Sequence, residues 1–170
     1  MSNYIFVDVE AFGAAPIRGK MTEFGAVHEK SLKTFHGVVL NSEPDPENPA
    51  KPLPTLEVMT ELPLVMAYFQ DWLKEVCGND RPVFVSDNVA YDWMWIACAF
   101  DESGLENPFG HSGRRISDFW AGLNNKWSET QSWKRFRRTK HDHNPVNDAM
   151  GNVEAFQEIK KIAEEQRNAN

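Results

Sequence analysis

The sequence predicts an α/β protein in which helices pack against a mixed β-sheet. Two observations predict this class. The chain opens with runs of bulky and β-branched residues, and segments with apolar residues at helical spacing follow them. A further short apolar strand is predicted between two of these helices. The 170 residues suffice for one domain with a substantial core and are few for two, so we expect a single domain over residues 1–170.

The first three strands are predicted close to the N-terminus. Residues 4–9 (YIFVDV) form one strand, and residues 21–29 (MTEFGAVHE) and 32–40 (LKTFHGVVL) form two more. The short turn at residues 30–31 is expected to join the second and third strands as a hairpin. Residues 41–55 carry five of the ten prolines, which predicts a loop.

The central part of the chain predicts helix, strand and helix. Residues 63–77 have apolar side chains at helical spacing, with Pro63 suited to the first turn and Gly78 suited to ending the helix. Residues 82–87 (PVFVSD) form a short apolar strand. Residues 89–100 form a strongly apolar helix that we expect to be covered on all sides.

Three more helices are predicted in the last third of the chain. Residues 116–123 and 130–138 are expected to form short helices. Asn144 is suited to capping the last helix and Pro145 to its first position, and this helix is expected to run to about Glu165.

Composition argues against two classes of protein. The net charge of −7 argues against a uniformly basic coat for long nucleic acid. No stretch approaches the roughly 20 apolar residues of a membrane span, and the N-terminus lacks the basic region of a signal peptide. Cys77 and Cys98 have no metal-ligand spacing. We therefore expect a reduced, cytoplasmic protein without membrane contact.

The first candidate site is the pair Asp8 and Glu10 at the end of the opening strand. Residues i and i+2 of a strand point to the same face, so both carboxylates project together. Two adjacent carboxylates repel each other unless a cation or a proton lies between them. The alternative is a strand that ends here with both acids solvated.

The second candidate site lies where the fourth strand meets the apolar helix. Asn88 follows the strand, and Asp92 lies one turn into the helix between Tyr91 and Trp93. Burying a charge there costs free energy unless the charge is paired or bound to a metal. The alternative is an acid placed near the helix N-terminus because the helix dipole favours it.

The third candidate site opens the last helix. Asp148 is expected in the first turn, with His143 just before the helix on the incoming loop. His141 and His143 also form an HxH pair, so a zinc or nickel protein is one alternative. Capping with solvated histidines is another.

Together, DxE on the first strand, N-x3-D near the middle and H-x4-D at the last helix resemble the DEDDh exonuclease superfamily. That superfamily includes ribonuclease T, oligoribonuclease and the proofreading subunits of DNA polymerases. Residues 22–27 (TEFGAV) and 116–119 (ISDF) match further segments of the family pattern, and the resemblance spans residues 4 to about 160. The segment from His141 to Phe156 looks most similar to small stand-alone exoribonucleases of bacteria and phages. The resemblance implies a ribonuclease H-like exonuclease fold, with a mixed sheet flanked by helices.

The resemblance also implies a metal centre and a base. Asp8, Glu10, Asp92 and Asp148 would hold two Mg²⁺ or Mn²⁺ ions, with Asp8 between them. His143 would act as the general base on the attacking water, because histidine titrates near neutral pH.

Six further residues are expected to bind substrate. Phe12 could stack on a terminal base, although a core position is the alternative reading. Residues 134–140 (KRFRRTK) carry five cations in seven residues directly before the histidines, and either bind phosphate or form a solvated face. Two positions depart from the family pattern, because Ala11 replaces a threonine and Asp87 replaces the histidine before Asn88. The residues expected to bind substrate are Ala11, Phe12, Asn88, Arg135, Arg138 and Lys140.

The expected function is 3′–5′ exoribonuclease activity on single-stranded 3′ ends. Alternatives are a DNA exonuclease of the same family and a catalytically silent nucleic-acid-binding relative. RNA is favoured over DNA because no polymerase domain or appended nucleic-acid module accompanies the candidate site. Analogy with the small stand-alone members leads us to expect a homodimer.

Overall fold

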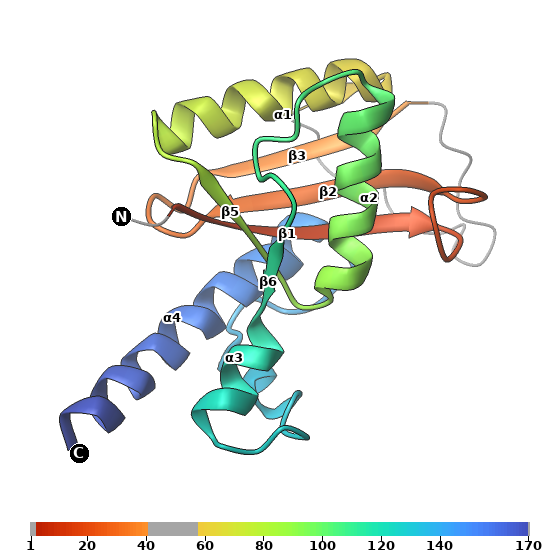
Figure 1. Ribbon diagram of the computed structural model, residues 1–170. Helices are drawn as coiled ribbons and strands as arrows, with labels where there is room; N and C mark the ends of the chain where they lie inside the picture. The colour runs from red at the N-terminus through yellow and green to blue at the C-terminus, as the bar shows by residue number, and fades with distance from the viewer. Residues whose placement is uncertain (1–2, 41–57, 170) are drawn as a thin grey trace.

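A computed structural model describes residues 3–40 and 58–169 of the chain, and in these residues six strands form one mixed sheet (Figure 1). The order across the sheet is β4-β3-β2-β1-β5-β6. Strand β1 pairs antiparallel with β2, which pairs antiparallel with β3, while β5 lies parallel to β1. Both edge strands, β4 and β6, pair parallel to their neighbours. The strands are β1 (Asn3–Phe12), β2 (Lys20–His28), β3 (Thr34–Val39), β4 (Val58–Thr60), β5 (Pro82–Ser86) and β6 (Gly113–Arg115).

Helices cover both faces of this sheet (Figure 1). On one face, α1 and α2 bury a core against alternate residues of β1, β2 and β3. On the other face, the start of α4 packs on β1 and β2, and α3 and the 3₁₀ helix η1 complete a second core around it. The helices are α1 (Leu62–Cys77), α2 (Val89–Glu102), α3 (Ile116–Leu123), η1 (Ser132–Phe136) and α4 (Pro145–Ala169).

The predicted α/β class and its mixed sheet are confirmed, and the predicted strand pair 21–29 and 32–40 forms the antiparallel pair β2–β3. The turn between these strands is longer than predicted, because Leu32 adopts a left-handed φ of 56° and the backbone N–H of His28 donates to the carbonyl of Lys33. The loop predicted at residues 41–55 lies outside the described residues.

The helix predicted at residues 130–138 is wrong in type and length. Only the 3₁₀ turn Ser132–Phe136 forms, and Arg137 is extended. Trp133 anchors this segment, because its fully buried indole N–H contacts the Ser117 hydroxyl at 3.1 Å and the Thr130 carbonyl at 3.0 Å. These tertiary contacts set the path of the chain in place of helical periodicity.

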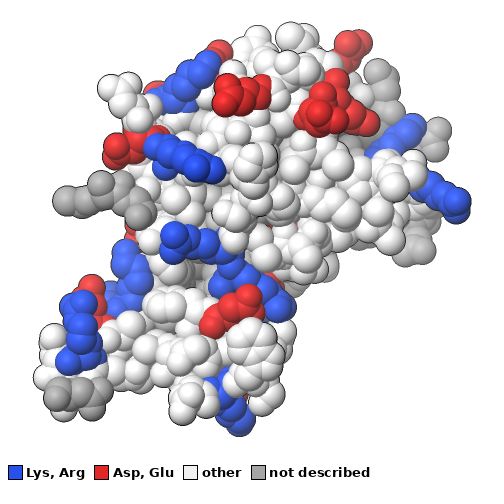
Figure 2. All heavy atoms as spheres, viewed as in Figure 1, with Lys and Arg blue, Asp and Glu red and all other residues white. Residues whose placement is uncertain are grey.

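The two edge strands were not identified from the sequence, because three-residue strands are too short to show a pattern of alternation. Charged residues are unevenly spread over the surface. On the face in Figure 2, most acidic residues lie in the upper half, whereas Lys and Arg occur in both halves, including over β6 and α4. In the part of the chain that the structure describes, no helix is long and apolar enough to cross a bilayer.

Candidate active site

Three carboxylates from two elements meet at the end of β1. Asp8 and Glu10 project from the face of β1 that faces α4, as their spacing predicts, and Asp148 lies in the first turn of α4. One carboxylate oxygen from each of the three lies within 4.8 Å of the others. Residues 140 positions apart in the chain thereby form one acidic cluster.

Gly25 is the reason that α4 can approach β1 so closely. This glycine pairs with Asp8 across β1 and β2. A Cβ atom at Gly25 would lie 2.3 Å from the Pro145 carbonyl carbon and from the Val146 nitrogen, so a side chain there would collide with the first turn of α4. The glycine of the TEFGAV segment therefore lets Asp148 reach Asp8.

The start of α4 is capped as the sequence predicts. The Asn144 side-chain oxygen accepts hydrogen bonds from the backbone N–H groups of Val146, at 3.0 Å, and Asn147, at 3.2 Å. The backbone N–H of Asp148 donates to the Asn144 carbonyl at 2.9 Å. Because these bonds satisfy the free N–H groups of the first turn, they fix the direction of the Asp148 carboxylate.

Asp92 supplies the fourth acid from α2, and it is only 4% exposed. Its Oδ1 accepts a hydrogen bond of 3.2 Å from the backbone N–H of Val9, between the two acids of β1. Burial is the largest cause that raises the pKa of Asp92 to about 7, and the charge of Asp87 adds to it. Without a compensating positive charge, the Asp92 carboxyl is thus about half protonated at pH 7.

Asp8 has a pKa raised well above its ordinary value. Burial is the first cause, and the negative charges of Asp92, Asp148 and Glu10 follow, while Arg137 acts in the opposite direction. A divalent cation would remove this penalty, because it stabilises the ionised forms of all four acids. The donor set consists of hard carboxylate oxygens, which suits Mg²⁺ or Mn²⁺. The residues present therefore fit a divalent metal.

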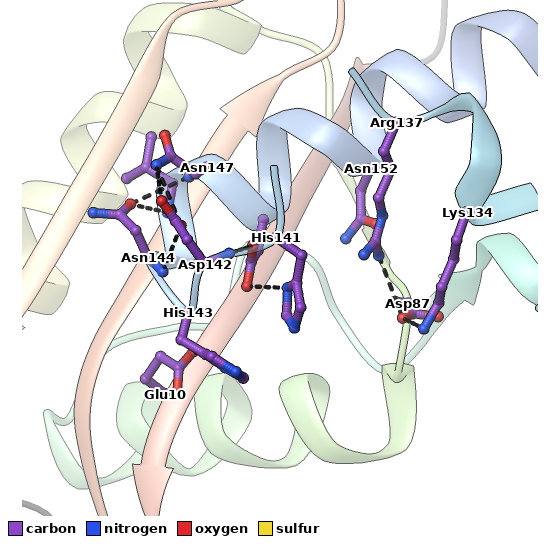
Figure 3. Close-up of polar contacts among 12 residues, drawn as sticks. Glu10, Asp87, Lys134, Arg137, His141, Asp142, His143, Asn144, Asn147 and Asn152 are labelled. Carbon is purple, nitrogen blue, oxygen red and sulfur yellow. Dashed lines mark hydrogen bonds and ion pairs between the residues drawn. The ribbon is translucent and has the colours of Figure 1, made fainter. Parts of the chain in front are cut away.

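Two histidines lie at the exposed rim of the cluster (Figure 3). His143 is in the left-handed region, with φ 61°, and its Nδ1 is 3.8 Å from Glu10 Oε1. His141 is closer to the acids, with its Nδ1 2.6 Å from Asp148 Oδ2. That pair lacks the alignment of a hydrogen bond, so Oδ2 accepts none from the described residues. The two imidazole rings are 4.6 Å apart.

The sequence did not indicate a third metal ligand beside the HxH pair, and the structure places one there. His141 and His143 form a possible metal-ligand group with Asp148, whose oxygen already belongs to the acidic cluster. The conformation of the loop brings these residues together, and the sequence pattern did not reveal that conformation. Asp142 accepts hydrogen bonds from the backbone N–H of Asn144 and the side chain of Asn147, which turns the loop back over α4.

The basic segment 134–140 reaches the acids through a cleft of about 630 Å³. Arg138 and Lys140 line it, as do Lys134, Arg137, Asp87, Thr139, Asp8 and His141. Arg135 does not line it, because its guanidinium lies 4.8 Å from the Phe136 ring centre and 5.7 Å from that of Trp120. Sequence reasoning missed Lys134 and Arg137, since an irregular segment gives no periodicity from which to read the direction of a side chain.

The other expected substrate residues lie around the end of β1. Phe12 is 41% exposed, so its alternative reading as a core residue is wrong. The register of β1 against β2 shifts between Glu10 and Ala11. Asn88 is exposed directly before α2, and its carbonyl accepts the backbone N–H of Asp92 at 3.0 Å.

No protein-family model matches the sequence. The chain is 28% identical, over 96% of its length and 95% of the relative's, to a protein of Escherichia coli named 3′-5′ DNA exonuclease Cap18. The nuclease domain of 3′hExo, a DEDDh family member solved with rAMP, has a similar fold, with a TM-score of 0.65, 14% identity, and coverage of 96% of this chain and 92% of that one.

Two other solved nucleases are similar in fold. Cell-death related nuclease 4 gives a TM-score of 0.71 at 14% identity and covers 95% of this chain and 64% of that one. Exonuclease I of E. coli in complex with single-stranded DNA gives 0.63 at 14% identity, covering 99% of this chain and 41% of that one. The expected ribonuclease H-like exonuclease fold is therefore confirmed. The chain is thus similar to a 3′-5′ DNA exonuclease along nearly its whole length, and it shares the fold of a DEDDh family nuclease.

Proposed function

We propose that the chain is a metal-dependent 3′–5′ exonuclease that removes nucleotides from the 3′ end of single-stranded nucleic acid. The convergence of Asp8, Glu10 and Asp148 on one another, with buried Asp92 beside them, carries this proposal. A buried cluster of like charges destabilises the protein unless it binds cations. Such a cluster next to a cleft lined with Lys and Arg is suited to a phosphodiester.

In this proposal Asp8, Glu10, Asp92 and Asp148 hold two divalent ions. Bound ions would supply positive charge for the attacking water and for the departing oxygen. The rigid supports of the acids, strand β1 and the capped start of α4, keep the carboxylates oriented before substrate arrives. Pre-organisation of this kind lowers the cost of reaching the transition state.

We assign His143 the role of general base. Its imidazole would take the proton from the water that attacks phosphorus, and the O3′ atom of the penultimate nucleotide would leave as the P–O bond breaks. The products are a nucleoside 5′-monophosphate and a strand one residue shorter. Glu10 Oε1, 3.8 Å from His143 Nδ1, would orient the ring and stabilise the imidazolium that forms.

The proposed polymer is DNA, with RNA as the second candidate. The sequence alone favours RNA, but the relative that the chain matches over 96% of its length is named a DNA exonuclease. RNA remains the second candidate because the similar nuclease 3′hExo was solved with the ribonucleotide rAMP. Contacts to the 2′-hydroxyl decide such a preference.

The test is incubation of the purified protein with matched 5′-labelled single-stranded DNA and RNA oligomers in Mg²⁺, Mn²⁺ or EDTA. A metal-dependent ladder that shortens from the 3′ end, and that is absent in Asp8→Asn, supports the proposal. The faster substrate gives the preferred sugar. Absence of cleavage of either polymer would contradict the proposal and favour a silent relative. Sedimentation of the same sample tests the expected homodimer.

A further inference from the structure

Asp87 forms an ion-pair cluster at one end of the cleft (Figure 3). Its Oδ2 is 2.7 Å from Lys134 Nζ and 3.4 Å from a terminal nitrogen of Arg137. Asp87 is only 21% exposed and Arg137 only 12%, so these charges interact with little screening by solvent.

The same two cations face the proposed metal centre. Lys134, Arg137 and Asp8 line one continuous cleft. A strand whose terminal phosphodiester sits at the acids would therefore have these cations within reach of its next charged group.

The identity of that charged group follows from the chemistry of a 3′ end. A 3′-terminal nucleotide carries a free 3′-hydroxyl and only one phosphate, the one that is cleaved. Any second phosphate near the cleavage point must therefore belong to the 5′ side of the strand. A site for a second phosphate in this cleft fixes the direction in which the strand leaves the enzyme.

We propose that Lys134 and Arg137 form a subsite for the phosphate on the 5′ side of the scissile bond, and that the Asp87 carboxylate occupies this subsite in the free protein. Substrate binding then exchanges one anion for another, because the phosphate replaces the carboxylate beside the two cations. This inference rests on the proposed exonuclease function, and it adds a residue that opposes substrate binding.

The contacts of Arg137 indicate that Asp87 competes with the substrate phosphate and is not needed to hold Arg137 in place. Asn152, which is fully buried, accepts a hydrogen bond of 2.5 Å from Arg137. The guanidinium also lies 4.9 Å from the ring centre of buried Trp133. Arg137 therefore stays in position without the Asp87 carboxylate. Its Nε is buried and has no hydrogen-bond partner among the described residues, so it has donor capacity left over.

The backbone at Asp87 is also held independently of its carboxylate. Arg115 donates a hydrogen bond of 2.9 Å from Nε to the Asp87 carbonyl oxygen. An asparagine at position 87 keeps this bond and can still accept from the Ser117 hydroxyl, which lies 3.4 Å from Oδ1. Asp87→Asn therefore removes the competing charge and leaves the subsite in place.

The decisive measurement is the affinity of wild type and Asp87→Asn for a short 5′-labelled thymidylate oligomer, read by fluorescence anisotropy in EDTA, where the proposed cleavage cannot occur. We expect Asp87→Asn to bind roughly three- to tenfold more tightly at low salt. The gain should shrink as salt rises, because counterions then occupy the vacated cations. Asp71→Asn is the matched control, since Asp71 is an exposed acid of α1 paired with Lys74.

Lys134→Met provides a second, independent variant. It should weaken binding roughly fivefold and reduce the slope of log affinity against log salt by about 0.7, the value for one lost phosphate contact on a single strand. Lys161→Met is its control, because Lys161 is 65% exposed on α4 and pairs with Glu158. If Lys134 only neutralises Asp87, its substitution will leave the affinity and the slope unchanged, and the subsite is refuted.

Kinetics on oligomers without a 5′-phosphate locate the subsite on the strand. A dinucleotide has only the scissile phosphate, and a trinucleotide has one more on the 5′ side. In Lys134→Met the ratio of kcat/KM for the trinucleotide over the dinucleotide should fall about tenfold. An unchanged ratio, or binding by Asp87→Asn that is equal to or weaker than wild type, overturns the inference. If only the proposed exonuclease activity is wrong, the expected changes in oligomer binding will be seen without any cleavage.

Discussion

The backbone N–H of Val9 donates a 3.2 Å hydrogen bond to Oδ1 of Asp92. This bond joins strand β1, between its two acids, to the first turn of helix α2. A buried carboxylate is thereby held against the strand that carries Asp8 and Glu10. The geometry depends on the oxygen of the Asp92 side chain, whereas the proposed metal binding depends on its charge.

We therefore expect Asp92→Asn to retain the fold and to lose activity. Asparagine keeps an acceptor for Val9 and removes the unfavourable buried charge, so the metal-free protein should be at least as stable as wild type. Turnover on a labelled oligomer should fall at least roughly 100-fold, because one of the proposed metal ligands loses its charge. Asp92→Ala should also lose about 1–3 kcal/mol of stability, since it leaves the Val9 N–H without a partner. Full turnover in Asp92→Asn would remove Asp92 from the metal centre.

The metal-free protein should lose stability as pH rises from about 4 to about 7. Burial raises the pKa of Asp92 from 3.8 to about 7 in the folded state. Across this window the folded protein keeps a proton that the unfolded chain has released, so the free energy of unfolding falls by up to about 1.4 kcal/mol per pH unit. Thermal unfolding in EDTA against pH measures this loss.

Mg²⁺ or Mn²⁺ should raise the melting temperature most at neutral pH, where the cation replaces the proton. The matched variant Asp92→Asn carries no titrating group at this position, so its stability should depend less steeply on pH. Equal pH dependence in the variant and the wild type would show that the buried carboxyl does not bind this proton.

His143→Ala should reduce turnover by roughly 10²- to 10⁴-fold without unfolding the protein, because the side chain is 63% exposed and is the proposed general base. His111→Ala, which changes another exposed histidine outside the cleft, is the control. His141→Ala separates the two rim histidines. If His141→Ala loses this activity and His143→Ala retains it, the base is the histidine 2.6 Å from Asp148.

Gly25→Ala should cost both stability and activity. The added methyl group would press on Pro145, so α4 must move away from the sheet and carry Asp148 away from Asp8. Overpacking of this kind costs about 1–3 kcal/mol. Gly122→Ala in α3 is the matched control, because a Cβ there meets no atom within 4 Å, and this change should stabilise the helix. Unfolding curves together with metal affinity measure both effects.

Phe12→Ala should weaken substrate binding and leave stability nearly unchanged. The ring is 41% exposed at the end of β1, two residues after Glu10. Stacking of one base on an aromatic ring contributes about 1–3 kcal/mol, so KM on an oligomer should rise several-fold or more. Leu64→Ala, at an exposed apolar position on α1, is the control. A KM that does not change would leave Phe12 without a role in binding.

Local patterns in the sequence were enough to predict the main elements and the positions of the acids. Strand periodicity puts Asp8 and Glu10 on one face without reference to the rest of the fold. Asn144 and Pro145 mark the start of α4, because capping and the missing N–H of proline are local properties. These predictions needed only residues that are close together in the chain.

Only the tertiary structure decided how the candidate site is assembled around those acids. Asp87 and Arg137 are separated by 50 positions, and no pattern within either segment encodes their contact. The segment 134–140 shows five cations, but packing around buried Trp133 decides that Lys134 and Arg137 face the cleft and that Arg135 does not. The sequence by itself therefore determined which chemical groups are present, and long-range packing determined which of them meet, because contact between distant segments depends on the shape of the whole core.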